Sequence, residues 1–279
     1  MGNKSIKIKL LTILLLLSGL GQAQPIIDIY LSSFSPNSDK RIFKHAEEFS
    51  EVLVSKSGHL PSYKYEKDYN ANGIITSEVK FNSAGGKIGE TTWTYNAKGE
   101  LLKIVSKQFA NFKGWTTDIT TLSYNDSTGC LSEIKNTFDG KIRFTANVTT
   151  DQGKITEVRV LNENGVLNGI ERLVYVPQQN MLRVLQYKAN EQFIGATTYP
   201  IDSHKKIPTS SINREVNEHG DVVVESLPNS KLEQGYYYEY EYDASGNWVE
   251  KRTYQCRVTS NKKVKDKKLE YKITRKLTY

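Results

Sequence analysis

The chain has 279 residues, of which 38% are hydrophobic and 10% aromatic, and its formal charge is +7. This length and composition are enough for one sizeable hydrophobic core, and no stretch rich in Pro, Ser or Gly divides the chain, so we expect one main domain. The excess of basic residues over 251–279 is typical of a solvated hairpin tip, and we expect no nucleic acid partner.

Residues 1–23 have the parts of a secretory signal peptide. The segment begins with three lysines, continues with an apolar run over 10–17, and has small residues at Gly21 and Ala23. The apolar run is shorter than the roughly 20 residues that a membrane-spanning helix needs. We therefore expect cleavage before Gln24, no membrane span after cleavage, and a mature protein that is periplasmic or secreted.

Residues 24–61 form an N-terminal segment that lacks the turn motif described below. Ser38 or Asp39 can cap a helix, and the apolar residues that follow recur at helical spacing. We expect a short helix here that packs on a sheet, with residues 26–31 as a first strand. The residues behind the helix prediction are Ile42, Phe43, Ala46, Phe49, Val52 and Leu53.

Residues 62–279 repeat one turn: a large apolar residue, Asn or Asp, two spacers, Gly, one spacer and a second large apolar residue. The Asn or Asp side chain bonds the following backbone, and Gly supplies the left-handed conformation that closes a three-residue hairpin loop with a bulge. The repeat predicts an all-β antiparallel meander of hairpins that is curled or closed on itself to bury one face. The turn glycines are Gly73, Gly99, Gly165, Gly220 and Gly246.

The last clear copy of the turn predicts a strand register. Because side chains alternate along a strand, its tyrosines at 236, 238, 240 and 242 share one face. Counting back from the turn without a shift gives the pairs Tyr242–Trp248, Glu241–Val249, Tyr240–Glu250 and Glu239–Lys251.

Variants of the pattern Tyr-x-Tyr-[Asn or Asp]-x-x-Gly-x-Leu occur over 93–101 with Trp93 first, over 122–131 with Leu122 first and one insertion, and over 240–248 with Trp248 last. The pattern resembles the YD repeats of Rhs-type proteins, and residues 240–252 and 273–279 resemble the end of small secreted repeat proteins from Bacteroidetes-like bacteria. The resemblance runs from about residue 65 onward and implies the hairpin-repeat fold. In that family the repeats are often described as carbohydrate-binding, and large relatives form shells around toxins, for which this chain is too short.

Two tryptophans are candidates for stacking on a sugar ring, Trp93 and Trp115, because flat aromatic faces with polar rims suit carbohydrates. Tyr95, Tyr242 and Trp248 occupy positions where the repeat demands packing, so we expect them in the core. Trp115 is the one aromatic residue that the repeat does not explain.

Cys130 and Cys256 bear on whether the sheet closes. In an oxidising compartment they can form a disulfide, but only if the sheet closes or folds back; two free thiols are the alternative. An outer-membrane barrel is disfavoured, because its strands need an uninterrupted lipid-facing side and the last aromatic face is expected to run into Glu250 and Arg252.

Few residues of the chain fit a catalytic pattern. The four histidines lack partners at metal-ligand spacing, and the sequence has no nucleophile elbow or phosphate loop. A cluster of carboxylates could serve as acid and base for glycoside cleavage. In the register above, however, Glu239 and Glu241 point to the sheet face opposite the one that carries Glu250. We expect no catalytic residue, cofactor or metal. The cluster is Glu239, Glu241, Asp243 and Glu250.

The sequence thus predicts an exported, non-enzymatic β-repeat module of the cell envelope that binds a glycan or acts structurally. The first alternative is that this chain is a protein partner of a secretion or toxin system and binds an envelope or secreted protein. A glycan-cleaving enzyme is the second.

Overall fold

The computed structural model describes residues 25–33, 42–53, 62–201, 214–226, 233–259 and 263–279; the expected signal peptide, residues 1–23, lies outside them. The described parts hold one α-helix, α1 (Asp28–Ser33), a short 3-10 turn at Pro177–Gln179 and strands of a single sheet. The strands are β1 (His45–Val52), β2 (Tyr63–Tyr69), β3 (Ile75–Phe81), β4 (Lys87–Tyr95), β5 (Leu101–Ala110), β6 (Gly114–Tyr124), β7 (Leu131–Phe138), β8 (Lys141–Asp151), β9 (Lys154–Asn162), β10 (Leu167–Val176), β11 (Met181–Lys188), β12 (Phe193–Pro200), β13 (Arg214–Val216), β14 (Val222–Ser226), β15 (Gln234–Tyr242), β16 (Trp248–Val258) and β17 (Val264–Thr278).

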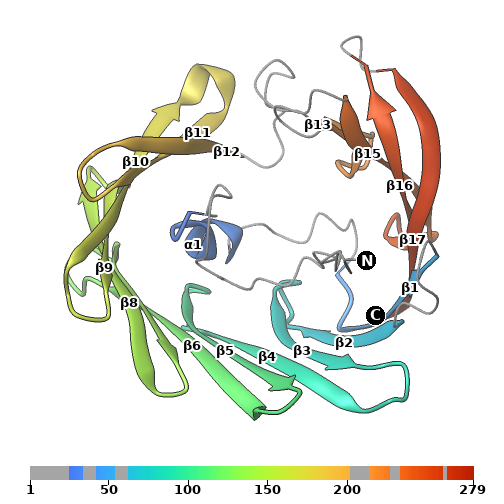
Figure 1. The fold of residues 1–279 in the computed structure, drawn as a ribbon, viewed down its shortest axis with the longest axis horizontal. Coiled ribbons are helices and arrows are strands. Elements are labelled where there is room, and N and C mark those ends of the chain that lie inside the picture. Colours follow the sequence, from blue (N-terminus) through green and yellow to red (C-terminus); the bar gives the residue numbers. More distant parts are fainter. Residues whose placement is uncertain (1–24, 34–41, 54–61, 202–213, 227–232, 260–262) are drawn as a thin grey trace, which may run out of the picture.

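The sheet is an antiparallel meander that curls around α1 (Figure 1). Strands β2 to β12 pair in chain order, and β13 to β17 do the same. β1 joins the two runs because it pairs with β2 on one side and β17 on the other. No ladder between β12 and β13 is seen in the described ranges, so the sheet is curled and not closed. The expected all-β meander is confirmed.

The N-terminal segment contradicts the expected order of helix and strand. Residues 26–31, expected as a strand, belong largely to the six-residue helix α1, and the expected helix over 42–53 is strand β1. β1 receives backbone hydrogen bonds from two neighbouring strands, so tertiary pairing outweighs the helical spacing of its apolar residues. Ile42, Phe49 and Leu53, which were to form the buried helix face, are about half exposed.

The motif turns form as predicted. The five motif glycines have φ angles from 74° to 87°, the left-handed region that glycine adopts without strain. In each turn the Asn or Asp carboxamide or carboxylate oxygen accepts two backbone N–H bonds, from the second and the fourth residue after it, as at Asn162 and Asp243.

A β-bulge beside the turn makes the register of the last hairpin differ from the predicted one. Tyr242 does lie opposite Trp248, but the ladder shifts by one residue at that point. The remaining pairs are Glu241–Glu250, Tyr240–Lys251 and Glu239–Arg252. The uniform count was wrong because the bulge places two residues of β16 against one of β15.

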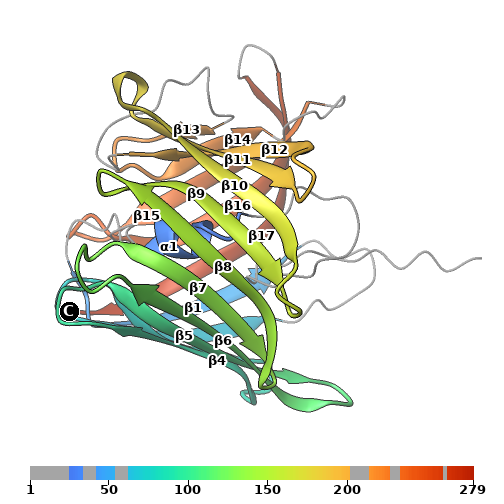
Figure 2. The same ribbon diagram turned by 90° about the vertical axis from the view of Figure 1, so that its left-hand side faces the viewer.

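The face that α1 packs against is the concave face, and the opposite one is the convex face (Figure 2 shows the latter over β4–β11). Over β5–β11 the concave side chains are mostly aliphatic and form the main core with Ile27, which is 0% exposed. The convex side chains of the same strands include many polar and charged residues, such as Lys103, Lys107, Thr121 and Arg159.

One carboxylate fixes the N-terminal segment to the core. Glu171 on β10 accepts the backbone N–H of Ile26 at 2.6 Å and of Ile27 at 3.0 Å. Burial raises the pKa of this carboxyl group to about 7, against the opposing effect of the two backbone bonds. Asp28, whose pKa is also raised by burial, bonds Tyr199 of β12.

Candidate functional site

The concave face changes character on β14–β17 and β1–β3, where tyrosines and basic side chains replace aliphatic ones. The cations lie over ring faces: Lys80 Nζ is 4.1 Å from the ring centroid of Tyr63, and Lys251 Nζ is 4.5 Å from that of Tyr238. We call this surface the aromatic–basic wall. It comprises Tyr63, Tyr65, Lys67, Lys80, Tyr238, Tyr240, Trp248, Lys251 and Arg275.

Glu48 of β1 binds two cations of the wall. Its carboxylate accepts hydrogen bonds from Lys67 Nζ and Arg275 Nε, both at 2.7 Å, and all three side chains are largely buried. Burial opposes ionisation of Glu48, but the two cations outweigh it and hold the pKa of this carboxyl below its usual range. Because breaking such a buried pair leaves an uncompensated charge, we interpret Glu48 as the residue that fixes β1 between β2 and β17.

Burial lowers the pKa of Lys80 and Lys251, which have no ion pair within the described ranges. Their ammonium groups are instead accommodated by the tyrosine rings. The wall is therefore engaged mainly in its own internal contacts.

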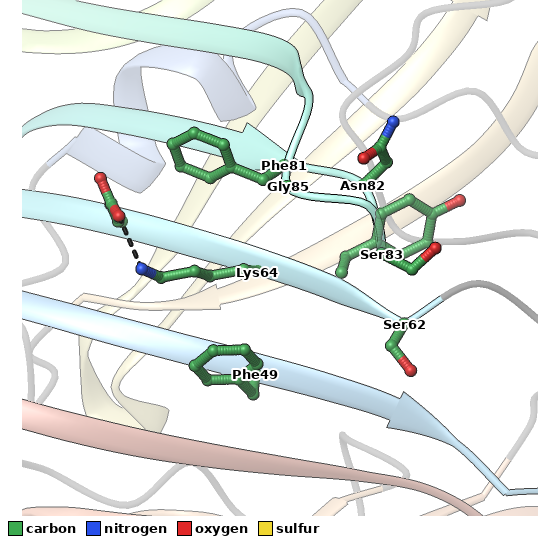
Figure 3. Close-up of a pocket in the computed structure, with 9 residues that line it drawn as sticks. Phe49, Ser62, Lys64, Phe81, Asn82, Ser83 and Gly85 are labelled. Carbon is green, nitrogen blue, oxygen red and sulfur yellow. Dashed lines mark hydrogen bonds and ion pairs between the residues drawn. The ribbon is translucent and has the colours of Figure 1, made fainter.

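A pocket of about 490 Å³ opens at the end of β1–β3 and the β3–β4 turn (Figure 3). Phe49 of β1 and Phe81 of β3 lie on either side of Lys64 of β2, on the same face of the sheet. Polar groups from Ser62, Asn82 and Ser83 complete the lining, together with Tyr63, Glu66 and Gly85. Two flat rings beside hydroxyl and amide groups form the kind of concave, mainly apolar site that binds small organic ligands.

Lys64 forms ion pairs with two glutamates at this pocket. Its ammonium lies 5.9 Å from the ring centroids of both Phe49 and Phe81, and it bonds Glu66 at 2.7 Å and Glu47 at 3.0 Å. These bonds to Glu66 and Glu47 raise the pKa of Lys64, and the bond from Lys64 lowers the pKa of Glu47. The pocket thus offers donors and acceptors for hydroxyl groups without an unpaired cation.

The sequence did not identify this pocket. The helical spacing predicts a helix at Phe49, and a helix would not place this ring beside Lys64 and Phe81. In β1 the buried residues alternate with more exposed ones, but the two that are buried are Ala46 and Glu48, so the sequence carries no apolar alternation that marks a strand here.

The two tryptophans predicted to stack on sugars lie on opposite faces. Trp93 faces the concave side and packs against the main core. Trp115 is on the convex side at the β5–β6 hairpin, 47% exposed, with its ring 5.8 Å from that of Phe109 in an edge-to-face contact. The structure thus leaves Trp115 accessible and Trp93 partly buried.

The candidate acid–base carboxylates are engaged in contacts of their own. Because of the register shift, Glu241 and Glu250 lie side by side, and Arg252 contacts both carboxylates. Glu239 bonds the Tyr254 hydroxyl at 2.8 Å and Lys267 at 3.4 Å. Asp243 accepts the backbone bonds of its own turn and a bond from the Tyr279 hydroxyl.

The two cysteines are free thiols in the structure. Cys130 is in the β6–β7 turn and Cys256 is on β16, which lies across the ring from that turn (Figure 1). The curled sheet therefore does not bring together the two residues considered for a disulfide.

Within the described ranges, no group of three or more His, Cys, Asp or Glu side chains could hold a metal ion. No helix in the same ranges is long and apolar enough to cross a membrane.

No family model matches the chain, and no curated protein matches it. One similar solved structure is a porin-like protein from Bacteroides uniformis, with 16% identity over 84% of this chain and 97% of that one, at a TM-score of 0.45. Another is TcdB2-TccC3, with 12% identity, 78% of this chain and 16% of that one, at a TM-score of 0.29. These likenesses are too weak to carry an argument about function.

Proposed function

We propose that this chain is an exported, non-enzymatic binding module of the cell envelope or the extracellular space, and that its ligand is a glycan held in the pocket between Phe49 and Phe81. The observation that carries the proposal is the arrangement of two aromatic rings on either side of Lys64, with Ser62 and Asn82 at the edge. Sugar rings have apolar faces and hydroxyl rims, which such a lining complements.

Support also comes from where the pocket lies. Phe49 is 48% exposed on the convex face, so a ligand can reach it without moving α1 or the main core. The lysine at its centre is already paired with Glu47 and Glu66, so binding would not require a charged ligand.

A glycan array tests this proposal. We expect the wild-type protein to give a signal that Phe49→Ala reduces at least fivefold, because the stacking face is lost, while Phe193→Ala, at an exposed phenylalanine of β12, leaves it unchanged. Absence of signal from any glycan would contradict the proposal and favour a protein partner. Release of new sugar ends from a bound polysaccharide would contradict the non-enzymatic assignment.

A further inference from the structure

The pocket is one end of a line of side chains that crosses the convex face. The ladders place Phe49 opposite Lys64, Lys64 opposite Phe81, and Phe81 opposite Lys87. On the next pair of strands, Gly89 lies opposite Gln108, so the following residue, Phe109, continues the line on β5.

Phe109 in turn lies opposite Trp115, the aromatic residue that the repeat motif does not explain. The line therefore runs across β1–β6 and takes its aromatic residues from β1, β3, β5 and β6. We call it the convex aromatic row: Phe49, Phe81, Phe109 and Trp115.

The three phenylalanines of this row are evenly spaced, and Trp115 lies directly beside the last of them. Neighbouring strands lie roughly 5 Å apart, so Phe49, Phe81 and Phe109, each two strands from the next, follow one another at roughly 10 Å. Phe49, Phe109 and Trp115 are each 47–48% exposed. Such a series fits an extended chain of repeating rings better than a single compact ligand.

The charges between the rings are balanced. Lys64 is paired with Glu47 and Glu66, and Lys87 bonds Glu90 at 2.8 Å. The contact with Lys87 lowers the pKa of Glu90, which keeps the carboxylate ionised beside the ammonium. The lysines between the aromatic residues therefore present no unpaired positive charge to a polyanion.

We propose that the convex aromatic row binds a linear, uncharged polysaccharide laid across strands β1–β6. This inference rests on the proposed function, since it extends the pocket into a longer site for the same kind of ligand. The pocket holds one end of the bound segment, and Phe109 and Trp115 contact sugar rings further along it.

The test compares short and long ligands. Disaccharides and hexasaccharides of the neutral cello, xylo, laminari and chito series are titrated against wild type, Phe49→Ala, Trp115→Ala and the control Phe193→Ala, with circular dichroism to show that each variant is folded. We expect the best series to bind at least tenfold more tightly as the hexasaccharide. Trp115→Ala should weaken hexasaccharide binding roughly fivefold and leave disaccharide binding within twofold, whereas Phe49→Ala should weaken both.

The outcomes separate this inference from the proposed function. Equal binding of both lengths, or a hexasaccharide affinity unaffected by Trp115→Ala, would overturn the row and leave the pocket intact. Preference for polygalacturonate, with affinity that falls as salt rises, would overturn the assignment of an uncharged ligand. No binding of any sugar would overturn the row and the proposed function together.

Discussion

At the scale of single residues, the turn asparagine stabilises its hairpin through two hydrogen bonds from the backbone. Asn162 Oδ1 accepts the backbone N–H groups of Asn164 and Val166, each at 3.0 Å. We predict that Asn162→Ala lowers the free energy of unfolding by about 1 kcal/mol, since each such bond contributes on the order of 1 kcal/mol and water partly replaces both. Urea unfolding measures the change. Asn164→Ala, at an exposed spacer of the same turn, is the control; an equal loss there would contradict the role of the side-chain bonds.

At the scale of elements, tyrosine hydroxyls connect successive hairpins. Each donates to the carbonyl of the residue two places after the glycine of an earlier turn. The pairs are Tyr95 with Ile75 at 3.1 Å, Tyr124 with Leu101 at 2.9 Å and Tyr240 with Val222 at 3.0 Å.

We predict that Tyr124→Phe lowers the free energy of unfolding by about 1 kcal/mol, because the carbonyl of Leu101 loses its side-chain donor in a partly buried position. Thermal or urea unfolding measures the loss. The matched change is Tyr187→Phe on β11, whose ring contacts Phe193 and Arg172 but whose hydroxyl has no bond within the described ranges. If both variants lose the same stability, the hydroxyl contact does not connect the hairpins.

The same scale shows what the sequence could and could not predict. Turns were predictable because Asn and Gly act locally, so the glycine positions and the tyrosine face of β15 are confirmed. β1 was not predictable from local patterns, since one of its two partners, β17, is distant in sequence and the buried Glu48 pairs with Lys67 of β2 and Arg275 of β17. Trp115 was selected as a candidate, but its neighbours in the row depend on ladders that no local pattern specifies.

At the scale of the whole molecule, the attachment of the N-terminal segment should depend on pH. The pKa of Glu171 is raised from its usual value near 4.5 to about 7 in the folded protein, so the folded state binds the proton more tightly. The stabilisation is complete below pH 4.5 and is lost as the pH rises through 7. We predict that wild type gains up to roughly 3 kcal/mol on acidification across this range relative to Glu171→Gln. Urea unfolding at several pH values tests this, and parallel pH profiles for the two proteins would contradict it.

The position of β1 between β2 and β17 has a consequence for how the chain assembles. His45 of β1 pairs with Thr278 of β17, so the ladder between these strands joins residues that are far apart in the sequence. Bringing such distant segments together costs loop entropy and is slow compared with closing a local hairpin. The hairpins can therefore form one after another as the chain folds, while β1 has only β2 as a partner until β17 is in place. Until that partner arrives, an unpaired strand edge is open to a neighbouring chain, which makes this late step the one most exposed to aggregation.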